Sequence, residues 1–438
     1  MQRHTIAFAG AAVLLLAACG ASVSADGTAT GGPTQDESSE YTTDTTDSTG
    51  TTGAGTGTDT PASGAVSGEP FGVAQIESSP NNVTESGIDA WRDRNLPASF
   101  PEPLIELDEI RSGGPPPDGI PPIDEPKFLE PAGVDYLADN EPVLALEIDG
   151  DARAYPVQIL TWHEIVNDTV GDVPVTVTYC PLCNSALAYD RRVTVDGTDQ
   201  VLDFGTSGLL WNSSLVMYDR QTETLWSHFT GEAVFGELTG IELADFPVST
   251  VAWSVWRDAH PDGLVLSRDT GFSRSYGSNP YPGYDDVNGI PFLFQGEVDG
   301  RYTALTRILG IERNDAAVGI PLPDLQEQRV IAGELDGETF VAWWTEGTSS
   351  ALDSREIAEG YDVGATGVFS NEADGAQFTF RPGDDGLFVD DQTGSTWNVL
   401  GQATSGELEG TQLEPLPHVD TFWFAWSTFQ PDTEIVAG

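Results

Sequence analysis

The chain repeats part of itself, and this repeat constrains the fold more than any other feature of the sequence. Residues 143–189 align with residues 308–354 at a constant offset and without a gap. A unit that is built twice should pack in the same way twice, so positions needed only for packing should be alike in both copies. Identical residues fall on each other at Leu144 and Leu309, Glu147 and Glu312, Ala152 and Ala317, Pro156 and Pro321, Leu160 and Leu325, and Ser185–Leu187 and Ser350–Leu352.

The repeat continues beyond this ungapped stretch. Asp219–Trp226 matches Asp390–Trp397, and Trp253 matches Trp423. Because both copies keep the Asp-x-Gln-Thr sequence and the tryptophan after it, we interpret them as structural, a turn followed by a core strand. The aromatic run 422–426 is expected to lie in the core as well.

The hydrophobic pattern is mainly that of β-strands. The segment Val173–Tyr179 is rich in β-branched residues and has the alternating pattern of a strand, and it leads directly into Cys180. Helical patterns are short, at residues 156–166 and 251–259. We therefore expect an α+β, β-rich fold made of an internally duplicated β domain, with residues 263–307 as a long irregular insert after the first repeat.

The N-terminus predicts export. After Arg3, an apolar run from Ile6 to Ala18 is too short to span a bilayer and ends in Leu-Ala-Ala-Cys-Gly, which resembles a bacterial lipobox. Residues 1–19 are therefore predicted to be a lipoprotein signal peptide. Cys19 would be acylated and would anchor the exported protein in the lipid bilayer, at the outer face of the cell membrane. An ordinary secretory signal with cleavage nearby is the alternative.

The rest of the chain divides by composition. Residues 20–70 are rich in Gly, Thr, Ser and Asp and contain no Lys or Arg, so they should form a disordered linker. A Pro-rich lead-in follows at 71–142. The first repeat, with its insert, covers 143–307, and the second covers 308–438.

The charge of the chain excludes one class of partner. The formal net charge is −52, and Lys127 is the single lysine. Nucleic-acid binding needs a basic surface, so no nucleic-acid partner is expected. The charge also opposes docking on anionic lipid, which leaves membrane attachment to the predicted lipid anchor.

Three residues that carry chemistry occur in only one of the two repeats. Cys180 and Cys183 fall on Thr345 and Thr348 of the second copy, and His163 falls on a glutamine. Residues that packing does not require in the other copy are the better candidates for function. The remaining histidines at 260 and 418 are expected at the surface or in loops.

The first candidate chemistry is metal binding. Two thiolates and an imidazole suit copper(I) or zinc, and soft ligands favour copper. Cys180, Cys183 and His163 would be the ligands, with His228 and Met217 as possible further ligands. A structural zinc site normally takes four protein ligands, which favours either copper, with two or three soft ligands, or no metal at all.

The second candidate is thiol redox chemistry with the Cys-Pro-Leu-Cys pair. Cys180 would attack, Cys183 would resolve and His163 would assist proton transfer. A third possibility is a binding or scaffold module whose disulfide is structural. A cysteine hydrolase with His163 and Glu164 as base and orienting group ranks below these. Whether the protein is an enzyme stays open at this point.

Several motifs together resemble the DUF 3179 family. They are Tyr155-Pro156, Trp162–Asp168, Thr178–Ala186, Phe204–Gly208 and Ser267–Gly271. The similarity covers about residues 115–438. The family is a domain of unknown function, so the resemblance implies no substrate, cofactor or catalytic residue.

Overall fold

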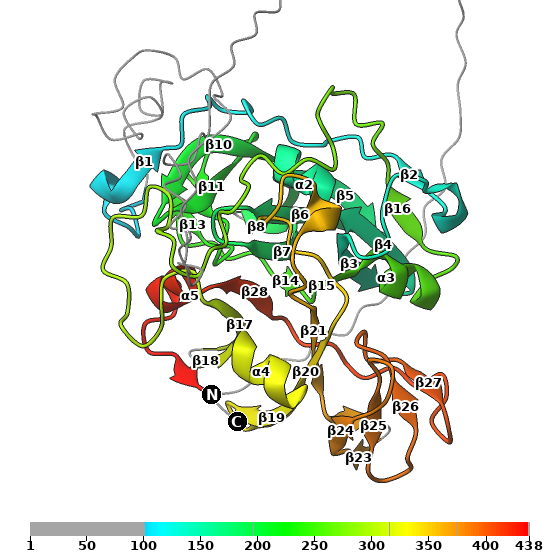
Figure 1. The fold of residues 1–438 in the computed structure, drawn as a ribbon. Coiled ribbons are helices and arrows are strands. Elements are labelled where there is room, and N and C mark those ends of the chain that lie inside the picture. The colour runs from blue at the N-terminus through cyan, green and yellow to red at the C-terminus, as the bar shows by residue number, and fades with distance from the viewer. Residues whose placement is uncertain (1–100, 196, 315, 374, 437–438) are drawn as a thin grey trace, which may run out of the picture. The chain divides into compact units, whose positions relative to one another are not determined.

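A computed structural model describes residues 101–438 apart from 196, 315, 374 and 437–438. The predicted signal peptide with Cys19, the linker and residues 71–100 lie outside the described residues. Strands dominate the described part and its α-helices are short (Figure 1), which confirms the β-rich α+β class. In that part of the chain no helix is long and apolar enough to cross a membrane.

The first half starts with a hairpin, a short helix and a three-stranded meander. Strands β3 (Pro142–Ile148) and β4 (Asp151–Pro156) pair across a turn at Asp149 and Gly150, whose φ values of 52° and 83° are ones that Asp and Gly tolerate. Helix α2 follows at Val157–His163. The meander consists of β5 (Ile165–Val170), β6 (Val173–Cys180) and β7 (Ser185–Asp190).

The second half runs through elements of the same kind in the same order. Its hairpin is β17 (Arg307–Arg313) with β18 (Ala316–Pro321), and helix α4 (Leu322–Gln328) follows. Its meander consists of β19 (Val330–Leu335), β20 (Glu338–Thr345) and β21 (Ala365–Ser370).

The strands that flank the two hairpins also correspond. Strand β15 pairs antiparallel with β3, and β16 pairs parallel with β4. In the second half, β28 pairs antiparallel with β17, and β29 pairs parallel with β18. These flanking strands are β15 (Ser249–Ala252), β16 (Leu264–Leu266), β28 (Val419–Phe422) and β29 (Glu434–Ile435).

Each half also has an antiparallel sheet that carries the Asp-x-Gln-Thr turn. Trp226 donates its indole N–H to Asp219 at 3.0 Å, and Trp397 donates to Asp390 at 3.0 Å. The turn and tryptophan are thus structural in both halves. The sheets comprise β1 (Ile110–Ser112) with β10 to β13 (Phe204–Trp211, Ser214–Asp219, Leu225–Ser227, Ala233–Phe235), and β24 to β27 (Phe380–Pro382, Phe388–Asp390, Thr396–Trp397, Ala403–Ser405).

The two meanders differ where β6 and β20 end. Cys180 is the cross-strand partner of Ser185 across a tight turn, whereas Thr345 is the partner of Ala365. Residues 346–364 therefore form an excursion. The insert holds it through backbone hydrogen bonds such as Gly283 N–H to Asp353 O and Asn279 N–H to Arg355 O. The constant offset holds up to the strand ends and is wrong for Ser185–Leu187, whose place in the sheet is taken by residues of β21.

Further short elements connect these units. Helix α3 (Trp253–Ala259) follows β15, and helix α5 (Trp423–Phe429) follows β28. The remaining strands are β2 (Phe128–Leu129), β8 (Arg192–Val195), β9 (Thr198–Val201), β14 (Asp245–Phe246), β22 (Glu372–Ala373) and β23 (Ala376–Gln377). Single 3₁₀ turns are η1 (Leu107–Glu109), η2 (Pro131–Gly133) and η3 (Ile357–Glu359).

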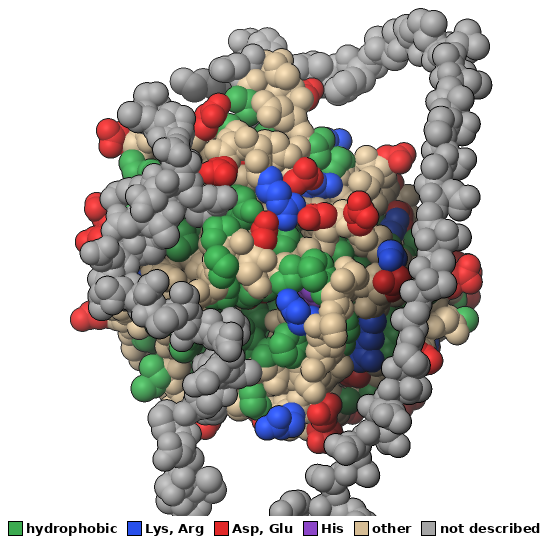
Figure 2. Space-filling view, turned by 90° about the horizontal axis from the view of Figure 1, so that it is seen from above, with side chains coloured by type: hydrophobic (Ala, Val, Ile, Leu, Met, Phe, Trp, Pro, Cys, Tyr) green, Lys and Arg blue, Asp and Glu red, His purple; other side chains and the backbone are tan. Residues whose placement is uncertain are grey.

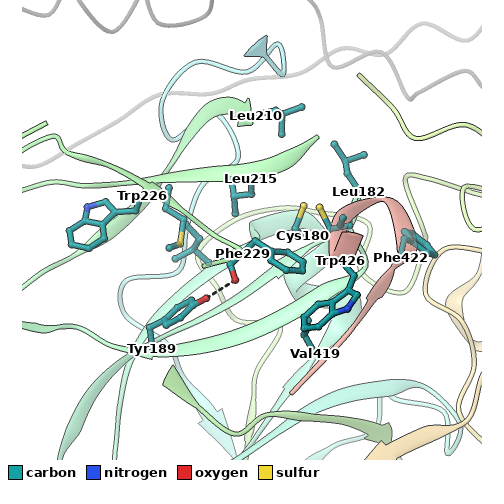
Figure 3. Packing of buried hydrophobic residues seen from close by; sticks show 14 of the residues in the cluster. Cys180, Leu182, Tyr189, Leu210, Leu215, Trp226, Phe229, Val419, Phe422 and Trp426 are labelled. Carbon is teal, nitrogen blue, oxygen red and sulfur yellow. Dashed lines mark hydrogen bonds between the residues drawn. The ribbon is translucent and has the colours of Figure 1, made fainter. Parts of the chain in front are cut away.

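One apolar cluster contains residues of both halves. It includes Cys180, Leu215 and Trp226 from the first half and Phe422 and Trp426 from the second (Figure 3). All of 422–426 is buried, as expected. The C-terminal aromatic run therefore packs against the hairpin that carries the cysteines.

The surface is not uniformly acidic. Figure 2 shows hydrophobic side chains gathered in the middle of one face, bordered by acidic and basic side chains. Large exposed hydrophobic residues occur in the lead-in and above all in the insert, namely Leu104, Phe272, Val287, Ile290 and Phe292.

Candidate functional site

The site is the turn between β6 and β7. Strand β6 ends at Cys180, residues 181–184 form the turn, and Ser185 begins β7. Asn184 lies in the left-handed region with φ 53°, and its N–H donates to Pro181 O at 3.3 Å. Because Cys180 and Ser185 are cross-strand partners, the turn brings Cys183 back beside Cys180.

Both cysteines are free thiols inside the core. Cys180 is 2% exposed and Cys183 is 0% exposed. Figure 3 shows Cys180 surrounded by Leu182, Leu215 and the aromatic residues of the C-terminal run. A reactant must therefore be small, or the covering segments must move.

The two thiols differ in proton affinity. Burial alone raises the pKa of Cys180, but the Cys183 thiol and the backbone N–H groups of Leu215, Cys183 and Leu182 donate to its sulfur, and the net pKa is lowered. Burial, donation of its own proton to Cys180 and the charge of Cys180 raise the pKa of Cys183 well above its usual value. Cys180 therefore loses its proton more readily than Cys183, whose thiol also donates to Ser213 O at 3.5 Å.

A buried carboxyl group belongs to the same site. Glu164 ends helix α2 in a positive-φ conformation (59°), and its carbonyl accepts the Tyr179 N–H at 2.8 Å. Burial raises the pKa of Glu164 well above its usual value, and the charge of Cys180 raises it further. Glu164 therefore holds its proton more tightly than an exposed glutamate does, and a negative charge on Cys180 strengthens this effect.

Sequence reasoning gave Glu164 only a minor role, although a signal was present. Its counterpart at the same offset is Arg329, which ends α4 in the same left-handed conformation (φ 64°). The carboxylate, like the cysteines, is confined to one half.

His163 contacts the Pro-rich lead-in and the insert, not the cysteines. Its Nδ1 hydrogen-bonds Pro121 O at 2.6 Å and its Nε2 hydrogen-bonds the Tyr276 hydroxyl at 2.6 Å. Tyr276 in turn contacts the Thr270 hydroxyl. Burial lowers the pKa of His163. Both ring nitrogens are therefore engaged away from the thiols.

Met217 and His228 are connected with strand β11, which packs beside Cys180. Met217 on β11 belongs to the same apolar cluster as Cys180. The His228 N–H donates to Leu215 O at 3.1 Å, and the Leu215 N–H faces the Cys180 sulfur. Both ring nitrogens of His228 are buried without a partner, and burial lowers its pKa to about 3. Across residues 101–436 as described, no three His, Cys, Asp or Glu side chains are arranged to hold a metal.

Distant segments close over the turn. The Tyr284 hydroxyl of the insert donates to Leu182 O at 3.0 Å. The Cys183 carbonyl accepts the Phe422 N–H at 3.0 Å and the Thr421 hydroxyl at 2.9 Å. These contacts could not be predicted from the sequence, because they are hydrogen bonds between residues that are far apart along the chain.

Comparison with known families gives one match. The model of the family described as "Protein of unknown function (DUF3179)" matches residues 117–433. The chain belongs to the DUF3179 family. No curated protein and no solved structure matches it. All residues of the site, from Glu164 to Phe422, lie within the DUF3179 match, but the family description assigns no activity.

Proposed function

We propose that this is an exported, lipid-anchored thiol–disulfide redox protein in which Cys180 and Cys183 alternate between dithiol and disulfide. The observation that carries the proposal is that one turn holds two thiols, of which Cys180 has a lowered pKa and Cys183 a raised pKa. A low-pKa attacking thiol beside a high-pKa resolving thiol is the arrangement that disulfide exchange requires. Export and anchoring follow from the predicted signal peptide and Cys19.

The reaction balances with the groups of the site and a small organic disulfide, R–S–S–R. The Cys180 thiolate attacks one sulfur, and the departing R–S⁻ takes the proton of Glu164. Cys183 then gives its proton to the Glu164 carboxylate and attacks the Cys180 sulfur. The second R–S⁻ leaves and takes that proton, so two thiols are oxidised to a disulfide and R–S–S–R is reduced to two R–SH.

The experiment is equilibration of the protein with buffers of reduced and oxidised glutathione, followed by acid quenching and intact mass measurement. The proposal predicts a reversible change between dithiol and a disulfide lighter by two hydrogens. It also predicts a trapped mixed disulfide on Cys180 when Cys183 is replaced by Ser. Thiols that stay reduced at every glutathione ratio in native protein, and oxidise only after unfolding, would contradict it.

Copper(I) binding is the second candidate. It is supported by His228, whose ring nitrogens are buried without a partner next to the strand that faces Cys180. Two soft sulfurs with an imidazole suit copper(I). His163 could join only by leaving Pro121 and Tyr276. Elemental analysis after purification without chelator tests this candidate, with about one copper per chain expected and loss of the metal on Cys180→Ser.

We also infer that the two halves arose by duplication of one unit. The support is the matched order of hairpin, helix and meander, the matched flanking strands, and the paired Asp–Trp hydrogen bonds. A thiol site on one copy of a doubled scaffold then leaves the other copy free of catalytic constraint.

A further inference from the structure

A second candidate site lies between the two halves. None of its lining residues belongs to the cysteine turn, although Phe229 and Trp426 pack in the same apolar cluster as Cys180. The site is a cavity of about 630 Å³. Its walls come from β7, β14 and the residues after β12 on one side, and from β17, β20, β28 and α5 on the other. Its size fits a small organic molecule.

Four carboxylates line this cavity: Glu242, Asp245, Glu312 and Glu338. Glu338 is paired with Arg313, which also lines the cavity, whereas the other three form no ion pair with a cation among the described residues. Burial, followed by the charges of Glu242 and Asp245, raises the pKa of Glu312 to about 7. The cavity therefore concentrates negative charge that the protein itself leaves uncompensated.

His418 supplies an independent sign of a ligand. The sequence predicts a surface or loop position; His418 lies in the loop before β28, is 7% exposed and lines the cavity. Its Nδ1 lies 2.8 Å from Leu416 O, and because a carbonyl only accepts, Nδ1 carries the proton. The other nitrogen, Nε2, is a buried acceptor without a partner. Buried polar groups are rarely left unpaired, so a hydrogen-bond donor is missing here.

The remaining walls are aromatic and apolar. Phe229 and Trp426 line the cavity with ring centroids 6.3 Å apart, next to Tyr189. The Tyr189 hydroxyl already donates to His228 O at 2.9 Å. Aromatic faces attract cations as well as apolar groups. The carboxylates and His418 are too widely spaced to form a metal-binding group in the described part of the chain, which favours an organic cation over a bare metal ion.

We propose that this cavity binds a small organic ammonium ion. Its N–H groups donate to Glu242, Asp245, Glu312 or His418 Nε2, and its apolar body packs against Phe229 and Trp426. This binding is independent of the thiol chemistry proposed above.

The test is calorimetric titration of the full chain at pH 8 and fixed salt with 2-phenylethylamine and 1,4-diaminobutane, and with 2-phenylethanol as the neutral match of the first. At least one of the two amines should bind. If 2-phenylethylamine binds, its alcohol should bind at least about tenfold more weakly, because the alcohol cannot form the ion pair that the ammonium group forms in the cavity. Glu312→Gln should weaken amine binding about tenfold. Glu334→Gln removes the same charge from an exposed position of β19 outside the cavity and should change nothing.

Three results would overturn the proposal. They are equal affinity for 2-phenylethylamine and its alcohol, equal losses in Glu312→Gln and Glu334→Gln, or no binding of either amine up to about 10 mM. Thermal melting of each variant confirms that it is folded, so loss of structure cannot imitate loss of the site.

Discussion

Strands β6 and β20 end in two different ways on closely similar scaffolds. In the first half the strand enters a tight turn that holds two thiols, and in the second it enters the excursion 346–364 with threonines at the same offset. Thr345, at the matching strand end, is buried at 6% exposure, against 2% for Cys180. The scaffold therefore does not need sulfur at this position, and the Cys180 thiol calls for an explanation other than packing.

The largest difference between the halves should appear on removal of the attacking thiol. Cys180→Ser should lower the rate of reduction of a small disulfide by at least about a thousandfold, because a hydroxyl cannot replace a thiolate nucleophile. Thr345→Ser at the matching position should leave the rate unchanged. A disulfide-exchange assay on both variants measures these rates. A Cys180→Ser protein that reduces disulfides at the wild-type rate would show that Cys180 is not the attacking thiol.

Replacement of Glu164 should have the next largest effect. Glu164→Gln removes the group proposed to carry protons and should slow exchange about a hundredfold. Because Gln is neutral like protonated Glu164, the pKa of Cys180, followed by alkylation rates across pH, should stay nearly unchanged. Arg329→Gln is the matched control in the second half, and a loss of similar size there would point to helix packing.

Glu164 also predicts a pH dependence of stability. Its folded pKa is raised, so its contribution to stability is complete below its unfolded pKa, near 4.3, and is lost as pH rises towards the folded value. Urea unfolding of the wild type should therefore show falling stability above this pH. The fall should be smaller in Glu164→Gln, and an unchanged slope would show that Glu164 ionises freely in the fold.

The tryptophan pair should behave alike in the two halves. Trp226→Phe and Trp397→Phe each remove an N–H bond to a buried aspartate and should each cost about 1.5–3 kcal/mol of unfolding free energy. Burial raises the pKa of Asp390, but hydrogen bonds from Trp397 and Thr393 outweigh it and lower the pKa. Its contribution is therefore present above its unfolded pKa near 3.9 and is lost as pH falls through the folded value. Clearly unequal losses of unfolding free energy at pH 7 would weaken the inference that the two Asp–Trp turns are equivalent.

The smallest effect is expected where the second half touches the thiol turn. Thr421→Val removes one hydrogen bond to the Cys183 carbonyl and should cost about 1 kcal/mol. It should also speed alkylation of Cys180 in the native state, because the turn is held less firmly. Thr366→Val, which breaks a hydrogen bond to Asp420 instead, is the control for stability loss without faster alkylation.

Much of the scaffold could be predicted from the sequence, but only part of the site. The alternation in β6, the short helical patterns at 156–166 and 251–259 and the repeated Asp–Trp pair are local patterns, and each predicted an element that the structure contains. The partners of His163 could not be predicted, because Pro121 and Tyr276 approach it from distant parts of the chain. The excursion after β20 could not be predicted either, because the ungapped alignment continues past the strand end at which the two halves diverge.

The hydrogen bonds from Thr421 and Phe422 to the Cys183 carbonyl have a consequence for biosynthesis. The ribosome makes the cysteines early and the strand that closes over them almost last. Until β28 has been translated and has docked, nothing from the C-terminal end covers the nascent thiols. A chain that is truncated before residue 419 would present an open, oxidisable cysteine pair to chaperones and proteases.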